Sequence, residues 1–372
     1  MLGVDIGGTK IALGRVLADG SLHGAVTRVP SDIRGSDELL GGLVAAVRRE
    51  VEGARRDGLQ VRGVGLGCAG TVDRDRGAVV VSPNLPLVDA PLVQVVSEQV
   101  GLPVVLDNDA NVAVLAEARV GAAAGLRQVA MLTLGTGVGG GLILDGRLYR
   151  GATGAAAELG HTIVAAGGER CGCGAFGCLE AYASGKALER TASRLIDAGG
   201  RVPGPAEAAA VGVSGWAATP GAWEPVGGVE AGGAGGADAA AAGASSTDRR
   251  TVGVGSVSVA ALAALREEGR LDGESIGRLA LKGDRGALLA VSEVGAWLGV
   301  GVVNLANVFE PEAVVVGGGL GTLGELLLRP ARRVLQAGAL KPNRYTRLLG
   351  AAVGAEAGVV GAGLLAWEDL GD

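Results

Sequence analysis

Residues 158–180 read ELGHTIVAAGGERCGCGAFGCLE, and this stretch gathers most of the metal-binding side chains of the sequence. It contains three of the four cysteines, Cys171, Cys173 and Cys178, together with His161, one of the two histidines. Three thiolates and one imidazole are a common tetrahedral set for Zn²⁺, and four protein ligands leave no open coordination position. The spacing therefore predicts a structural zinc site that holds this loop in one conformation.

Two alternatives to a metal stay open for these cysteines: a disulfide from Cys178 to Cys171 or Cys173, and unlinked buried thiols. A disulfide would leave one cysteine over and give His161 no role, which favours zinc. Glu158 and Glu180 flank the site, so a loop held by a metal would fix the positions of these two carboxylates relative to each other. The fourth cysteine, Cys68, lies far away in sequence and is expected to be a small buried hydrophobic residue.

Length and composition restrict the class of protein. The chain has 372 residues, enough for two domains with separate cores. Hydrophobic residues make up 48% of it but aromatic residues only 2%, so the cores must consist mainly of Val, Leu and Ala. A net charge of −6 without a long basic run argues against nucleic acid as a partner.

Nothing in the sequence is typical of a secreted or membrane protein. The chain does not open with a charged segment followed by an apolar one. The longest apolar stretch, residues 294–309, is interrupted by Asn304 and Asn307 and is too short to span a bilayer. Because zinc-binding cysteines must stay reduced, we expect a soluble, cytoplasmic protein with no membrane partner.

Two glycine- and threonine-containing loops share one design. A buried strand at residues 2–6 leads into Gly-Gly-Thr-Lys at 7–10, and a strand at 129–134 leads into Gly-Thr-Gly-Val-Gly-Gly-Gly at 135–141. Each loop is followed by a second strand and an Asp-Gly turn, which is a hairpin signal. The pattern predicts a duplicated unit whose loops offer backbone N–H groups and threonine hydroxyls to a polyphosphate. The alternative is chance similarity among 69 glycines.

A third polar motif follows the strand predicted at residues 104–106. Asp107-Asn108-Asp109-Ala110-Asn111 precedes a helix predicted over 110–120, so Asp109 lies where a buried strand gives way to a helix. Ligands bind at this position in open α/β sheets. From position alone, Asp109 could equally be an ordinary helix N-cap.

The rest of the chain alternates between helices and strands, apart from one segment. Residues 199–256 consist mainly of Gly, Ala and Pro without periodicity, which predicts a loosely packed insertion. The other expected elements are helices at 36–58 (capped by Ser36 and ended by Gly58), 90–100, 179–198, 286–309, 323–335 and 355–367, and strands at 61–66, 313–316 and 346–352.

Five motifs occur in an order that resembles the ROK family of repressors and sugar kinases, within the actin/hexokinase-like ATPase superfamily. They are DIGGTK (5–10), LDNDAN (106–111), GTGVG (135–139), ELGH (158–161) and CGCGAFGCLE (171–180). The resemblance covers nearly the whole chain. It implies an α/β fold of two ribonuclease-H-like domains flanking a cleft, a small one of residues 1–107 plus 355–372 and a large one of 108–354. The implied activity is ATP-dependent phosphorylation of glucose at the 6-hydroxyl.

The resemblance also implies roles for single residues. Asp109 would be the catalytic base, and structural Zn²⁺ would be bound by His161, Cys171, Cys173 and Cys178. The sugar would be held by Gly70, Asn84, Asn108, Glu158, His161 and Glu180. ATP with Mg²⁺ would be held by Asp5 (through water), Gly7, Gly8, Thr9, Lys10, Thr136, Gly137, Gly317, Gly318 and Gly319.

Alternatives within the family stay open at this stage. The same polar set serves kinases for N-acetylmannosamine, N-acetylglucosamine, mannose or fructose, and the phosphate donor could be polyphosphate. A sugar-sensing transcriptional regulator is a further alternative, although regulators of this family carry an N-terminal winged helix and here the phosphate hairpin begins at the first residues. The family implies a homodimer or homotetramer.

Overall fold

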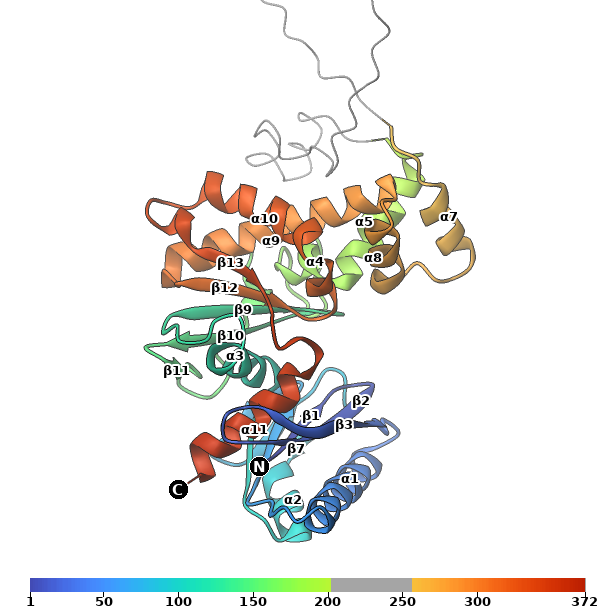
Figure 1. Ribbon diagram of the computed structural model, residues 1–372. Coiled ribbons are helices and arrows are strands. Elements are labelled where there is room, and N and C mark those ends of the chain that lie inside the picture. Colours follow the sequence, from blue (N-terminus) through green and yellow to red (C-terminus); the bar gives the residue numbers. More distant parts are fainter. Residues whose placement is uncertain (202–255, 372) are drawn as a thin grey trace, which may run out of the picture.

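The structure is a computed structural model that describes residues 1–201 and 256–371, and these residues form two lobes (Figure 1). Each lobe is built on a five-stranded sheet. The predicted insertion lies almost wholly outside the described residues; at its ends, Arg201 and Ser256 pair in an isolated β-bridge.

The first sheet has the strand order β3-β2-β1-β4-β8. Strands β1, β4 and β8 pair in parallel, whereas β2 pairs antiparallel with both β1 and β3. In β1 every residue except Asp5 is buried, as expected for a strand covered on both faces. The strands are β1 (Leu2–Ile6), β2 (Lys10–Val16), β3 (Leu22–Pro30), β4 (Val64–Cys68) and β8 (Val104–Asn108).

The second sheet repeats this arrangement with the order β11-β10-β9-β12-β13. Here β9, β12 and β13 are parallel, and β10 and β11 are antiparallel. The predicted duplication is therefore confirmed, since each sheet begins with a three-stranded meander and adds two parallel strands. The strands are β9 (Val129–Leu134), β10 (Val138–Leu144), β11 (Arg147–Leu148), β12 (Ala313–Gly317) and β13 (Arg347–Gly350).

Helices cover both faces of each sheet (Figure 1). The first sheet packs against α1 (Ser36–Arg56) and α2 (Leu92–Val100) on one face and α11 (Ala357–Leu370) on the other, and these elements form the first lobe. The second lobe consists of the second sheet, α3 (Asp109–Arg119) and the remaining helices. Those helices are α4 (Glu180–Ala183), α5 (Gly185–Asp197), α7 (Ala260–Glu267), α8 (Gly273–Leu281), α9 (Arg285–Phe309) and α10 (Glu325–Gly338).

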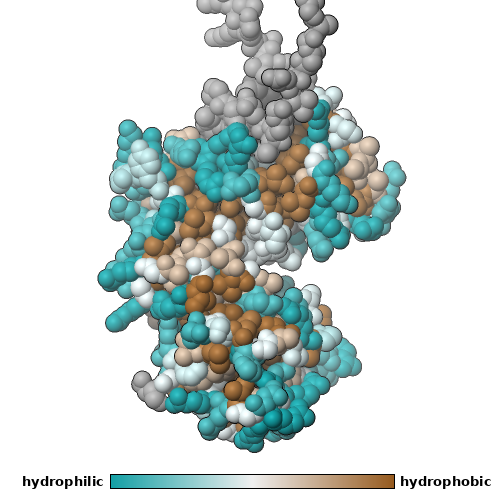
Figure 2. Space-filling model, viewed as in Figure 1, coloured by the Kyte–Doolittle hydropathy of each residue, from teal (hydrophilic) through white to brown (hydrophobic). Residues whose placement is uncertain are grey.

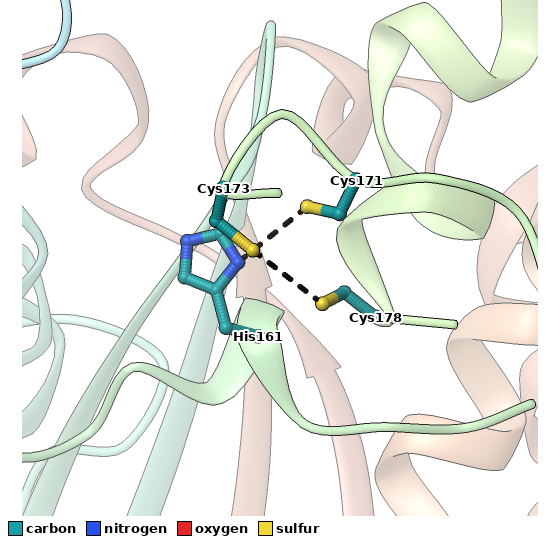
Figure 3. A group of neighbouring side chains, drawn as sticks. All are labelled: His161, Cys171, Cys173 and Cys178. Atoms are coloured by element: carbon teal, nitrogen blue, oxygen red, sulfur yellow. Dashed lines mark hydrogen bonds between the residues drawn. The ribbon is translucent and has the colours of Figure 1, made fainter. Parts of the chain in front are cut away.

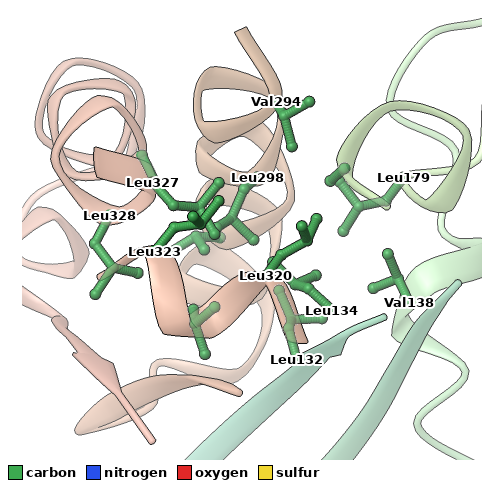
Figure 4. Packing of buried hydrophobic residues seen from close by; sticks show 14 of the residues in the cluster. Leu132, Leu134, Val138, Leu179, Val294, Leu298, Leu320, Leu323, Leu327 and Leu328 are labelled. Atoms are coloured by element: carbon green, nitrogen blue, oxygen red, sulfur yellow. The ribbon is translucent and has the colours of Figure 1, made fainter. Parts of the chain in front are cut away.

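The core of the second lobe is aliphatic, as the composition predicts. Leucines and valines of β9, β10, α9 and α10 interdigitate around Leu298 and Leu320 (Figure 4). Helix α9 is long and apolar enough to cross a bilayer by length and composition alone, but 67% of its most apolar window is buried inside the lobe. Residues 294–309 are therefore part of a core helix.

Helices α3 and α11 connect the two lobes. Helix α3 follows the last strand of the first sheet and packs on β9 and β10, whereas α11 follows the last strand of the second sheet and packs on β1 and β4. The two helices touch at backbone level: a Cβ on Gly361 would lie 1.7 Å from the carbonyl oxygen of Val112. On the face drawn in Figure 2 the surface is hollowed between the lobes.

Several local predictions were wrong. Gly35, not Ser36, is the N-cap of α1, so no side chain caps this helix. The predicted helix 179–198 is two helices, because Ser184 is extended and caps α5 with its hydroxyl. The second loop is shorter than predicted because β10 already begins at Val138. Three short strands that form a separate sheet were missed: β5 (Thr71–Asp73), β6 (Ala78–Val81) and β7 (Val88–Ala90).

Candidate active site and metal centre

The parallel strands of the first sheet end side by side and bring polar residues to one edge. Asp5 of β1 and Asp107 of β8 both pair with Gly67 of β4, so they stand at the same level of the sheet. Asn108 ends β8 and is the N-cap of α3, because its side-chain oxygen accepts hydrogen bonds from the amides of Ala110 (2.8 Å) and Asn111 (3.2 Å). The alternative reading of Asp109 as the N-cap is therefore wrong.

Asp5 and Asp109 are two carboxylates close enough for the charge of Asp109 to act on Asp5. Burial raises the pKa of Asp109 above its ordinary value, although the Ala110 amide, which donates to Oδ1 at 2.9 Å, opposes this effect. Burial, and next the charge of Asp109, raise the pKa of Asp5 to about 6, against the opposing charge of Lys10. Two neighbouring, half-buried carboxylates favour a proton or a cation between them.

The residues expected to hold a sugar adjoin this edge from two directions. The Asn108 side-chain amide donates to the carbonyl oxygen of Gly70 at 3.0 Å, which ties the turn after β4 to the start of α3. Asn84 lies against the first glycine loop: a Cβ on Gly8 would be 3.0 Å from the Cβ of Asn84. Asn108 thus meets Gly70, and Asn84 meets the first glycine loop, although the members of each pair are distant in sequence.

The two Gly/Thr loops are tight turns with exposed tips. The Gly7 amide donates to the carbonyl of Lys10 at 3.0 Å, and the Gly135 amide donates to the carbonyl of Gly137 at 2.9 Å. Thr9 and Thr136 are both exposed at the tips. Their hydroxyls and the neighbouring amides are therefore accessible to an anion.

Gly317, Gly318 and Gly319 adjoin the second of these loops. Gly317 ends β12 beside Thr133 of β9, and a Cβ on Gly318 would lie 2.5 Å from the carbonyl oxygen of Leu134. Gly318 also has a φ of +79°, which favours glycine. Space is open above Gly319.

Strand β10 separates α3 from the turn that carries Glu158 and His161. A Cβ on Gly141 would lie 2.8 Å from the carbonyl oxygen of Ala110, and a Cβ on Gly160 would lie 2.0 Å from that of Val138. Glycines at these contacts let helix α3 and the 3₁₀ turn Leu159–His161 approach the strand from its two sides. Glu158, exposed, precedes this turn.

The four predicted zinc ligands converge, as Figure 3 shows. One ligand atom from each of His161, Cys171, Cys173 and Cys178 lies within 4.8 Å of all the others. The sulfurs of Cys173 and Cys178 are 3.8 Å apart, and His161 Nδ1 is 3.7 Å from the Cys171 sulfur. Sulfurs bound tetrahedrally at about 2.3 Å from zinc are about 3.8 Å apart, whereas a disulfide is about 2.05 Å long. The cluster therefore fits zinc, and its cysteines are free thiols.

Glu180 joins the metal cluster to the second glycine loop. One oxygen accepts the Val138 amide at 3.0 Å, and the other accepts the Cys171 thiol at 3.3 Å. A Cβ on Gly137 would lie 2.3 Å from the first oxygen, so a larger residue there would displace the Glu180 carboxylate. The carboxylate thus faces the loop and the metal ligands at once.

Sequence reasoning missed a supporting group, Asp107. Its side chain is only 3% exposed; one oxygen accepts the Asn111 side-chain amide at 2.8 Å, and the other accepts Arg150 Nε at 2.6 Å. Arg150 lies beyond β11, on the segment that leads to Glu158. The polar residues of the Asp107–Asn111 motif were the only signal in the sequence that pointed to Asp107. They gave no indication that Arg150 would be its partner.

Comparisons with known proteins agree with this geometry. The chain matches the ROK family over residues 1–219 and 230–369. It is 36% identical to a glucokinase of Streptomyces coelicolor over 99% of this chain and 97% of that protein, and 32% identical to a glucokinase of Thermotoga maritima over 89% and 86%. A crystal structure of a ROK family glucokinase from Streptomyces griseus, in complex with glucose and AMPPNP, superposes with a TM-score of 0.73 at 35% identity, covering 99% of both chains.

The chain therefore belongs to the ROK family. Its two lobes are the two domains of the actin/hexokinase-like ATPase fold. The relatives that match it along nearly their full length include glucokinases and a ROK hexokinase of Thermus thermophilus, which is 32% identical and superposes with a TM-score of 0.68 over 100% of this chain and 99% of that chain.

Proposed function

We propose that this ROK protein is a sugar kinase that transfers the γ-phosphoryl group of ATP to the 6-hydroxyl of glucose, with Asp109 as the general base. The activity rests on full-length similarity to glucokinases, one of them solved with glucose and an ATP analogue. The observation that carries the base assignment is the position of Asp109: a carboxylate with a raised pKa at the start of α3, beside Asp5 and next to the first glycine loop.

The chemistry of phosphoryl transfer needs such a group. A sugar hydroxyl must lose its proton as it attacks phosphorus, and a carboxylate within hydrogen-bond reach can accept that proton. Burial keeps the Asp109 carboxylate short of water, which makes it a stronger base than an exposed aspartate. In the proposed complex the 6-hydroxyl donates to Asp109.

The sugar would be oriented by groups from both lobes. In this proposal Gly70, Asn84 and Asn108 of the first lobe would bind the sugar from one side, and Glu158, His161 and Glu180 of the second lobe from the other. Support comes from the contact of Asn108 with Gly70 and from the contact of Glu180 with the metal cluster that contains His161. Acceptors and donors fixed in this way select hydroxyls by position. Zinc at His161 and the three cysteines would keep the loop rigid and would hold one ring nitrogen of His161.

The phosphates would lie between the loops Gly7–Lys10 and Gly135–Gly137. Their amides and the hydroxyls of Thr9 and Thr136 would hold phosphate oxygens, Lys10 would add a positive charge, and Gly317–Gly319 would leave room for the adenosine. The raised pKa of Asp5 fits a carboxylate that serves a cation through water. Magnesium there would neutralise charge on the phosphates.

Other expectations stay proposals. We divide the chain into a small domain (residues 1–107 and 355–372) and a large one (108–354), because each range is built on one of the two five-stranded sheets. A homodimer or homotetramer and a cytoplasmic location follow from the family and from the reduced cysteines.

A sugar panel tests the function. ADP release from ATP, followed by a coupled assay, should be fastest with glucose and slower with N-acetylmannosamine, N-acetylglucosamine, mannose and fructose. Polyphosphate as the donor releases no ADP, so it is tested by measuring the sugar phosphate that forms. Asp109→Asn serves as the inactive control. A chain that binds glucose but releases no ADP with any sugar would overturn the kinase proposal and favour a sugar sensor.

A further inference from the structure

One fully buried carboxylate has no part in the mechanism above. Glu117, in the last turn of α3, has 0% of its surface exposed. Its side chain accepts three hydrogen bonds, all from backbone amides: Oε2 accepts from Ala122 at 2.7 Å and Ala352 at 3.0 Å, and Oε1 accepts from Val353 at 2.8 Å. A buried carboxylate is costly unless such donors satisfy it, so these amides hold a charge in place.

The three amides belong to the two connections between the lobes. In the described residues the chain passes from the first sheet to the second through α3 and residues 120–128, and it returns through residues 351–356 into α11. Ala122 lies in the first connection, and Ala352 and Val353 lie in the second. The chain winds closely around the carboxylate, since a Cβ on Gly121 would lie 2.2 Å from Oε2.

We propose that Glu117 is a positioning residue for phosphoryl transfer, because it fixes both connections to the helix that carries Asp109. This inference rests on the proposed function. A carboxylate shared by the two connections lets the lobes rotate about it but prevents the connections from separating. Glu117 therefore keeps the position and orientation of the Asp109 helix constant relative to the loops of the second lobe.

The leverage follows from helix geometry. Asp109 and Glu117 are eight residues apart on α3, which corresponds to about 12 Å along the axis. If the Glu117 end is released, a tilt of α3 by about 5° displaces Asp109 by about 1 Å, and a misplacement of this size costs roughly 10²-fold in rate. The effect should appear in kcat more than in KM, because the groups that bind each ligand remain.

Glu117→Gln tests this proposal, because the two side chains have nearly the same shape. The substitution replaces one acceptor oxygen by an NH₂ group, which cannot accept a hydrogen bond from the backbone amide that it faces. We expect kcat to fall about tenfold to 10²-fold while KM for glucose and ATP changes by less than about threefold. The matched control is Glu312→Gln: Glu312 accepts the amides of Arg127 (2.7 Å) and Gln128 (3.0 Å) but ties the first connection to the second lobe alone. Its kcat should stay within about twofold of wild type.

Hydrogen exchange gives a readout that does not depend on catalysis. Without any ligand, Glu117→Gln should accelerate exchange at Ala122, Ala352 and Val353 together, whereas Glu312→Gln should leave all three unchanged. This result would stand even if no sugar were phosphorylated, so failure of the proposed function is distinguishable from failure of this proposal.

Two outcomes overturn the proposal. One is a folded Glu117→Gln protein with wild-type kcat, and the other is accelerated exchange in only one of the two connections. If Glu117→Gln does not fold, wild-type exchange decides: a common opening rate for the three amides supports the proposal, and separate rates for the two connections refute it.

Discussion

Replacing Asp5 should make the protein more stable and less active at the same time. The pKa of Asp5 is raised from 3.8 to about 6 by burial and by Asp109, so the folded protein binds a proton there more tightly than the unfolded chain does. Stability from this group is therefore fully present below pH 3.8 and is lost as pH rises through 6. At 1.36 kcal/mol per pKa unit, a rise of the Asp5 pKa from 3.8 to about 6 corresponds to about 3 kcal/mol. The ionised Asp5 carboxylate therefore lowers the free energy of unfolding by about 3 kcal/mol at pH 8.

Asp5→Asn removes this cost. Its free energy of unfolding should match that of wild type near pH 4 and exceed it by about 3 kcal/mol at pH 8, with the difference growing between these values. Magnesium is omitted, because a bound cation would relieve the same repulsion. In the presence of magnesium and ATP, the variant should lose most of its activity.

Urea unfolding from pH 4 to pH 8 measures the difference between the two free energies of unfolding. Trp367, whose indole donates to the carbonyl oxygen of Val16, reports on the lobe that contains Asp5. Asp75→Asn is the control, because Asp75 is exposed and the substitution removes the same charge. In an Asp109→Asn background the gain from Asp5→Asn should shrink, since Asp109 contributes to the shift. A gain that does not vary with pH, or no gain at pH 8, would refute the reasoning.

Two further predictions concern the metal loop. Cys173→Ser should lower the zinc content below one ion per chain, measured by elemental analysis, and should weaken glucose binding. Cys68→Ala is the control and should keep the metal, because Cys68 lies outside the cluster. Full zinc content with unchanged glucose affinity in Cys173→Ser would contradict the zinc assignment. Gly160→Ala should weaken glucose binding by about tenfold or more in calorimetry, because its Cβ would meet the carbonyl of Val138 at 2.0 Å and displace the turn. Gly172→Ala, where the nearest atom is 3.9 Å away, is the control, and equal affinities for the two variants would disprove the contact.

Local chemistry made much of the site predictable from sequence. The cysteine spacing was enough to predict the cluster that the structure brings together. The two hairpins with their Gly/Thr loops predicted the repeated sheet order, because each unit carries its own strand and turn signals.

Features that depend on distant partners could not be predicted. The role of Glu117 depends on amides 235 and 236 residues further along the chain. The break at Ser184 has a similar cause: the amide of Gly185 donates to the carbonyl of Gly135 at 2.8 Å, which ties the start of α5 to the second loop. Three consecutive glycines hid the start of β10, because a strand interior rarely contains them.

The most direct test of the account is single-turnover phosphorylation of glucose by wild type and Asp109→Asn as a function of pH. Wild type should lose rate on the acid side, at a pH above the ordinary carboxyl range, because the pKa of its base is raised by burial. Asp109→Asn should bind glucose within about threefold of wild type yet transfer phosphate about 10²–10⁴-fold more slowly, and its acid limb should change because Asp109 no longer contributes to it. A variant that transfers phosphate at the wild-type rate, or that keeps the same acid limb, would contradict the assignment of Asp109 as the base.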